Sequence, residues 1–221
     1  MALRRGILFP PILMLLAASA SAGVIRGTLW LGALPRAGEV AAPRVQKGVA
    51  DAVVYLERIP DNVEARLAHP MTGVWIFRKS VSLPAPSIVQ KGLKFSPRVA
   101  VVAAGSRVEF SNTDRVYHNA FSVSAARRFD LGKYAPGHRD TLLFKRPGVI
   151  NLHDDIFPDM LGYLVVTPNH AFARPDSTGR FELPRLPAGS YTLRVWHPHR
   201  GEIRRNILVP KRGDVDVELK L

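Results

Sequence analysis

The chain has 221 residues, 47% of them apolar, so it is long enough and apolar enough to fold around a core. This composition excludes an intrinsically disordered chain. The 31 Lys and Arg residues outnumber the 18 Asp and Glu residues, and the formal net charge of +13 favours anionic partners. The chain has no cysteine, which excludes disulfides, a thiolate nucleophile and a thiolate metal ligand.

Residues 1–22 have the pattern of a signal peptide. Arg4 and Arg5 precede the apolar run Ile7–Ala18, and Ala20-Ser21-Ala22 is a small-x-small cleavage site. The run is shorter than the roughly 20 apolar residues that span a bilayer. We therefore expect an exported chain, periplasmic or secreted, that begins at Gly23 and has no transmembrane segment after cleavage. An uncleaved membrane anchor is the alternative.

Short β-branched runs separated by Gly and Pro predict an all-β chain. Two strand-like runs, Val24–Leu31 and Asp51–Glu57, follow the signal peptide, and residues 61–85 are expected to form an irregular connection. Residues 86–168 contain a series of short apolar runs between turn residues such as Gly105-Ser106 and Pro147-Gly148. This pattern is typical of a Greek-key sandwich.

The last part of the chain alternates most clearly between apolar and polar residues. Phe181 and Leu183 share one face of a predicted strand, as do Tyr191, Leu193 and Val195, with a Pro-Ala-Gly turn between the two runs. Two further strands are expected at the end of the chain, over Ile203–Val209 and Val215–Leu221.

Residues 86–168 also carry a set of short segments in a recognisable order. They are Gln90-Lys91, Phe95-Ser96-Pro97, Gly105–Phe110, Asn112-Thr113-Asp114, His118-Asn119, Phe121-Ser122-Val123, Arg128–Gly132, Pro147-Gly148-Val149 and Ile156–Tyr163. Together they resemble the plastocyanin-like cupredoxins, in particular the exported proteins named for methylamine utilisation. The resemblance implies a Greek-key cupredoxin-like sandwich that carries a copper centre.

In that family, copper lies between the first-histidine loop and a closing loop that reads Cys-x-x-His-Pro-x-Met. Two histidines and a thiolate bind in a plane, with a weak axial methionine. His118 and Met160 match this pattern, whereas Asp154 takes the place of the cysteine and Phe157 that of the second histidine. A blue type 1 site needs the thiolate, so we expect no blue-copper electron transfer.

The resemblance leaves His118, Asp154 and Met160 as candidate metal ligands, with His153 and Asp155 as neighbouring donors. An imidazole and carboxylates form a hard-ligand set, for which Cu(II) is the candidate ion and Zn(II) the alternative. The alternative is that His118 bonds Asp154 or a backbone carbonyl, and that Met160 packs in the core.

A second resemblance covers both ends of the chain. The segment Asp176–Val195 resembles the second half of a carboxypeptidase regulatory-like domain, a transthyretin-like β-sandwich, and Gly27-Thr28-Leu29 and Asp51–Leu56 resemble its first half. We therefore expect residues 23–60 and residues 169–221 to form one discontinuous sandwich, with the cupredoxin-like residues 86–168 inserted. Two domains in sequence are the alternative.

These features favour an exported cupredoxin-like protein with a degenerate copper site, at which residual metal binding is left open. The alternative is a non-catalytic binding or scaffolding module of the periplasm. The basic surface is compatible with an anionic periplasmic protein or polysaccharide as partner, and a solvated basic surface without a partner is the alternative. Nucleic acid is not expected, because the basic residues are scattered and form no recognition motif. No pair of side chains in the sequence has the pattern of a catalytic site, so we do not expect an enzyme.

Overall fold

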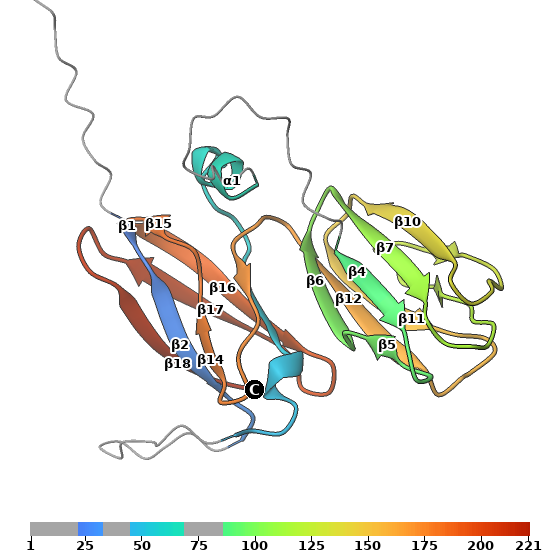
Figure 1. The fold of residues 1–221 in the computed structure, drawn as a ribbon. Coiled ribbons are helices and arrows are strands. Elements are labelled where there is room, and N and C mark those ends of the chain that lie inside the picture. The colour runs from blue at the N-terminus through green and yellow to red at the C-terminus, as the bar shows by residue number, and fades with distance from the viewer. Residues whose placement is uncertain (1–21, 33–44, 69–85) are drawn as a thin grey trace, which may run out of the picture.

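A computed structural model describes residues 22–32, 45–68 and 86–221 (Figure 1). The predicted signal peptide, apart from Ala22, lies outside the described residues. Within them, one helix and one 3-10 turn (Val49–Asp51) accompany strands that form several sheets, which confirms an all-β chain. The described part contains no helix that is long and apolar enough to cross a membrane.

The first of two sandwiches, which we call the terminal sandwich, takes strands from both ends of the described chain (Figure 1). Its strands are β1 (Ala22–Gly23), β2 (Ile25–Trp30), β3 (Val53–Leu56), β13 (Phe172–Ala173), β14 (Arg180–Glu182), β15 (Leu186–Pro187), β16 (Gly189–His197), β17 (Gly201–Val209) and β18 (Val215–Lys220). One sheet has the order β13-β3-β16-β17 and the other the order β14-β2-β18, while β1 pairs with β15. Strands β2 and β3 therefore hydrogen-bond to strands from the C-terminal part of the chain.

Apolar and polar residues alternate along these strands, and the apolar ones form the core of the terminal sandwich. Phe181, Leu183, Tyr191, Leu193 and Val195 are all buried, as their spacing predicts. Apolar side chains of β2 and β3 belong to the same core cluster. Residues that are far apart in the sequence therefore pack together in one core.

The segment predicted to be an irregular connection begins with a helix, α1 (Asp61–Ala68), so the prediction is wrong for these residues. Asp61 and Glu64 lie in the first turn, where the helix dipole favours acidic side chains. Val63 is buried and Leu67 packs against the core of the terminal sandwich. A helix of only 8 residues gives too short a periodic pattern to be recognised in the sequence.

The second sandwich, which we call the central sandwich, spans residues 87–167. Its strands are β4 (Ser87–Gln90), β5 (Phe95–Ser96), β6 (Val99–Ala103), β7 (Ser106–Asn112), β8 (Phe121–Ser122), β9 (Phe129–Asp130), β10 (Arg139–Phe144), β11 (Gly148–His153) and β12 (Leu161–Thr167). The two sheets have the orders β10-β7-β4-β5 and β6-β12-β11-β8-β9, with β4 parallel to β7 and β6 parallel to β12. A core that includes Phe110, Phe144 and Leu164 lies between them.

The two sandwiches meet through apolar side chains. Val53 and Tyr55 of β3 form one buried cluster with Val99 of β6 and with Tyr163 and Val165 of β12. These strands carry apolar residues on both faces, because one face packs on the core of their own sandwich and the other on the neighbouring sandwich. The junction is therefore a packed interface.

A single arginine adds polar contacts to this junction. One nitrogen of the Arg98 guanidinium donates to Asp51 Oδ2 at 2.8 Å, and a second lies 2.7 Å from His199 Nε2. Because an arginine only donates, His199 Nε2 is the acceptor. The guanidinium carbon also lies 5.8 Å from the centre of the Tyr163 ring. Arg98 of the central sandwich thus binds two loops of the terminal sandwich.

Candidate functional site

The loops that carry the candidate metal ligands meet at one end of the central sandwich. Strand β11 ends at His153, so Asp154 lies in the loop that follows and is free of the strand's alternation. His118 is held by a bridge to Tyr134: His118 N donates to Tyr134 O at 3.1 Å, and Tyr134 N donates to His118 O at 2.9 Å. The strand end and the bridge bring the Asp154 and His118 side chains together.

The His118 ring lies between two carboxyl groups. Its Nδ1 is 2.6 Å from Asp154 Oδ2, and the side chains of both residues are 0% exposed. Its Nε2 is 3.1 Å from Asp114 Oδ2. A carboxylate only accepts hydrogen bonds, so each contact needs a proton from the ring or from the carboxyl group. Both ring nitrogens are therefore engaged within the protein.

The Asp154 carboxylate accepts hydrogen bonds at both oxygens. Oδ1 accepts from the backbone N–H groups of Ile156 and Phe157, at 2.8 and 3.1 Å. Oδ2 accepts from Gln90 Nε2 at 3.1 Å and from the backbone N–H of Asn119 at 3.3 Å, besides its contact with His118. A buried carboxylate is tolerated only where such donors replace water. The closing loop therefore folds around Asp154.

A tyrosine completes this set of bonds. The Tyr134 hydroxyl donates to Gln90 Oε1, and Gln90 Nε2 donates to the backbone carbonyl of Asn119 at 2.9 Å. Burial first, and then the charges of Asp154 and Asp140, raise the pKa of Tyr134 well above its usual range. The hydroxyl therefore remains a donor. We call His118, Asp154, Asp114, Gln90 and Tyr134 together the buried network.

Asp114 connects the buried network to a neighbouring loop. Its carboxylate accepts from the backbone N–H of Gly92 at 2.6 Å and of Leu93 at 3.0 Å. Burial alone would raise the pKa of Asp114, but the amides of Leu93 and Gly92 and the His118 ring lower it below its usual value. The β4–β5 loop and the first-histidine loop are thereby joined.

The side chains do not fit a copper ion between His118 and Asp154. Two ligands that bind one tetrahedral ion at about 2.0–2.2 Å lie about 3.3–3.6 Å apart, whereas the 2.6 Å between Nδ1 and Oδ2 is a hydrogen-bond distance. The Phe157 ring, at the position where the resemblance implies a second histidine, has its centre 5.0 Å from that of the His118 ring. Met160 is buried in the apolar core. A direct hydrogen bond thus joins the two side chains that the resemblance gives as metal ligands.

The two neighbouring donors do not join the network. The His153 ring stacks on Phe121, with 5.6 Å between the ring centres, and Asp155 is exposed. Over residues 22–32, 45–68 and 86–221, no three His, Cys, Asp or Glu side chains are grouped so as to hold a metal ion. Of the predicted set, the structure joins only His118 and Asp154.

Sequence reasoning did not identify Asp114, Gln90 or Tyr134 as partners of these side chains. Asp114 had a usable signal, because it belongs to the turn-forming run Asn112–Asp114 and stands four residues before the histidine. Gln90 and Tyr134 come from distant segments, and only the sheet register places them beside Asp154 and His118.

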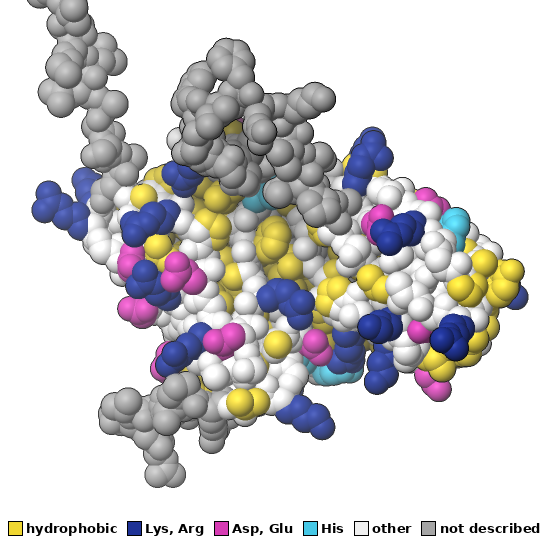
Figure 2. Space-filling model, viewed as in Figure 1, with side chains coloured by type: hydrophobic (Ala, Val, Ile, Leu, Met, Phe, Trp, Pro, Cys, Tyr) yellow, Lys and Arg dark blue, Asp and Glu magenta, His cyan; other side chains and the backbone are white. Residues whose placement is uncertain are grey.

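Exposed apolar side chains lie over the buried network. Leu93, Val116 and Tyr117, which we call the apolar cluster, are 47%, 42% and 58% exposed. The backbone of Leu93 bonds Asp114, and the other two residues stand between Asp114 and His118. Figure 2 shows apolar side chains gathered at the end of the central sandwich that is farthest from the terminal sandwich. A contiguous exposed apolar patch is a candidate interaction surface.

Basic side chains flank the apolar cluster. Lys91 and Lys94 stand on either side of the Leu93 loop, and Arg115 precedes Val116. All three basic residues are exposed, and none forms an ion pair with a carboxylate of the described residues. The cluster is therefore flanked by three basic side chains that no carboxylate of the described residues neutralises.

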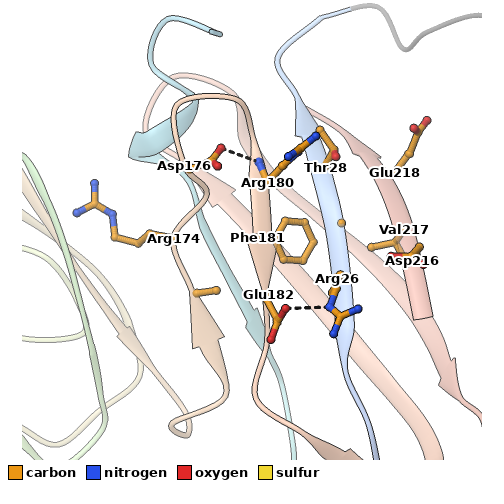
Figure 3. Close-up of a pocket in the computed structure, with 12 residues that line it drawn as sticks. Arg26, Thr28, Arg174, Asp176, Arg180, Phe181, Glu182, Asp216, Val217 and Glu218 are labelled. Carbon is orange, nitrogen blue, oxygen red and sulfur yellow. Dashed lines mark hydrogen bonds and ion pairs between the residues drawn. The ribbon is translucent and has the colours of Figure 1, made fainter. Parts of the chain in front are cut away.

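A cavity of about 670 Å³ lies on the terminal sandwich, along β2, β14 and β18 (Figure 3). Arg26 forms ion pairs there with Glu182 at 2.8 Å and with Asp214 at 3.1 Å. The strand register places Arg180 and Glu218 on either side of Thr28. Charges of both signs that alternate across strands are typical of a solvated outer sheet face, so this cavity does not select a ligand by charge.

Comparisons with known proteins give structural likenesses only. No protein-family model and no curated protein matches the chain. A Cu-containing nitrite reductase from Thermus scotoductus SA-01 is 26% identical with a TM-score of 0.40, over 47% of this chain and 26% of the reductase. An amicyanin variant in its reduced state is 21% identical with a TM-score of 0.36, over 39% of this chain and 86% of the amicyanin. A purple cupredoxin from Nitrosopumilus maritimus is 21% identical with a TM-score of 0.34, over 37% of this chain and 99% of that protein. This chain thus spans about a quarter of the nitrite reductase.

Proposed function

We propose that this chain is an exported, non-catalytic binding protein. Its central sandwich is a cupredoxin-like domain in which the buried network has replaced the copper centre. His118 and Met160 keep the family's positions and the closing loop keeps its spacing, while the thiolate and the second imidazole are gone. The observation that carries the proposal is the 2.6 Å contact between His118 Nδ1 and Asp154 Oδ2.

The terminal sandwich belongs to the same proposal. We take it to be a discontinuous, carboxypeptidase regulatory-like domain that holds the central sandwich as an insertion. Its support is the pairing of β2 with β14 and β18, and of β3 with β13 and β16. The buried junction and the Arg98 contacts hold the two sandwiches together. The terminal sandwich is thus a rigid support, and the end of the central sandwich that lies farthest from it is available to a partner.

The binding face is the apolar cluster with its flanking basic side chains. The buried network fixes the loops beneath this face, so binding there costs little ordering of the backbone. Exposed Leu, Val and Tyr side chains need an apolar counterpart, and Lys91, Lys94 and Arg115 need anionic groups around it. An acidic periplasmic protein offers both, whereas an acidic polysaccharide offers only the charge.

Site-specific photo-cross-linking in the cell envelope tests this face. A photoreactive residue at Tyr117 is expected to capture one protein partner, because this side chain is 58% exposed at the centre of the face. The yield should fall by about tenfold when the salt concentration is raised to 1 M, where the Debye length is about 3 Å. The adduct is detected by electrophoresis and identified by mass spectrometry.

Leu208 is the matched control position, since this exposed apolar residue lies on β17 of the terminal sandwich. The same adduct from both positions would show indiscriminate capture and would contradict the proposed face. Adducts with carbohydrate alone would point to the polysaccharide and reject a protein partner.

A further inference from the structure

The end of the central sandwich opposite the binding face is built from three turns that pack together. In the β6–β7 turn, Gly105 N donates to Phe144 O at 2.7 Å. Strand β11 is tied to the loop after β8, because Asn151 N donates to Ser124 Oγ at 2.9 Å. Gly148, which follows the β10–β11 turn, faces Ala126 so closely that a Cβ at this glycine would lie 2.8 Å from the Cβ of Ala126. The three turns therefore form one surface.

Among the residues that the structure describes, this surface carries basic side chains and no acidic ones. We call it the basic end, and it consists of Arg107, Arg127, Arg128, Lys145 and Arg146. All are exposed except Arg127, which is half-buried. None forms an ion pair within the part of the chain that the structure describes. The carboxylate nearest along β7, Glu109, is already paired with Arg139 at 3.2 Å. The positive charge of the basic end is therefore not compensated.

The packing beneath the basic end holds part of this charge in place. The Arg127 guanidinium carbon lies 4.7 Å from the centre of the Phe144 ring, and Phe144 is buried in the core. Stacking on an aromatic ring fixes a guanidinium while its N–H groups stay available. The backbone of Arg107 is held on β7, where its Cα pairs with that of Leu143 on β10, so its side chain starts from a fixed point. Fixed cations lose less entropy on binding than mobile ones.

The shape of the basic end favours a surface as its ligand. The described cavity lies on the other sandwich, and the basic side chains are spread over neighbouring turns. Mobile anionic headgroups in a membrane can each bind one of these dispersed cations. A small anion, in contrast, needs several groups that converge in one pocket. Strands β7 and β11 run from the basic end to the loops of the buried network (Figure 1). A membrane at one end thus leaves the apolar cluster facing away from it.

We propose that the basic end docks this protein on anionic phospholipid headgroups. The contact is peripheral and electrostatic, with arginine forks on phosphate oxygens and no inserted segment. It is independent of the partner that binds at the opposite end, so the failure of one proposal leaves the other standing.

Co-sedimentation of the mature protein with vesicles tests this docking. We expect binding to vesicles of phosphatidylglycerol mixed with phosphatidylcholine, and no binding to phosphatidylcholine alone. Exchanging Arg128, Lys145 and Arg146 together for glutamine should weaken binding on the order of 100-fold, since each cation near an anionic surface contributes about a fivefold factor. The three single exchanges should each give about a fivefold loss.

The control variant exchanges Arg200, Arg205 and Lys211 for glutamine on the terminal sandwich. These residues are also two arginines and one lysine, all exposed, so net charge and composition change equally. Equal losses in both variants would mean attraction by net charge only and would overturn the proposal. So would failure to bind the anionic vesicles, or binding at the basic end of an acidic polysaccharide in place of the vesicles.

Discussion

Replacing Asp154 with cysteine and Phe157 with histidine in one variant is expected to create a coloured copper site. The closing loop would then read Cys-x-x-His-Pro-x-Met, with His118 opposite it and Met160 at its end. A thiolate and two imidazoles in a plane, with a weak thioether, form the ligand set of a blue site. The variant should bind one Cu(II) with intense visible absorption and the electron paramagnetic spectrum of a copper thiolate.

The two single variants are its controls. Asp154→Cys alone lacks the second imidazole, and Phe157→His alone lacks the thiolate, so neither should give the full spectrum. A folded double variant that binds no copper, or binds it without colour, would mean that the loops do not place these positions around one point. The cupredoxin-like reading of the central sandwich would then be rejected.

Asp154→Ala should destabilise the natural protein by about 3–5 kcal/mol, the range seen when one partner of a buried charged pair is removed. The change leaves His118 Nδ1, Gln90 Nε2 and the backbone N–H groups of Ile156 and Phe157 without their acceptor. Each buried donor left unpaired adds to the loss. Urea unfolding followed by circular dichroism measures the difference in free energy.

The neighbouring residue provides a matched control. Asp155 is also an aspartate of the closing loop, but it is exposed, so Asp155→Ala should change stability by no more than about 0.5 kcal/mol. Equal effects of the two substitutions would mean that Asp154 does not hold the loop. Asp154→Asn should fall between them, because the amide keeps an acceptor but loses the charge.

The alternation of apolar residues was enough to predict the strands, since it follows from which face of a sheet is buried. Phe181 and Leu193 show this directly, and both are buried. Helix α1 was missed because one short helix with a single buried residue, Val63, leaves no repeat in the sequence. The junction was missed as well, because Val53 and Val165 look like ordinary strand residues until both faces of their sheets are known.

Only the central pair of the candidate site, His118 and Asp154, could be predicted from the sequence. The resemblance placed His118 opposite Asp154, and the alternative reading of a direct bond between them is the one found in the structure. The resemblance placed Met160 beside this pair, and the structure buries its side chain in the core cluster against which Phe157 of the closing loop also packs. Gln90 and Tyr134 could not be predicted, because their approach depends on the pairing of β4 with β7 and on the bridge to His118.

Metal content is the most direct test of the claim that a hydrogen bond has replaced the copper centre. The purified mature protein, loaded with Cu(II) and then desalted, would be measured by elemental analysis and electron paramagnetic resonance beside a His118→Ala variant. We predict far less than one copper per chain, and the same amount in both proteins. One tightly bound copper per chain that disappears in the His118→Ala variant would show that His118 and Asp154 separate to bind metal, and would contradict the account.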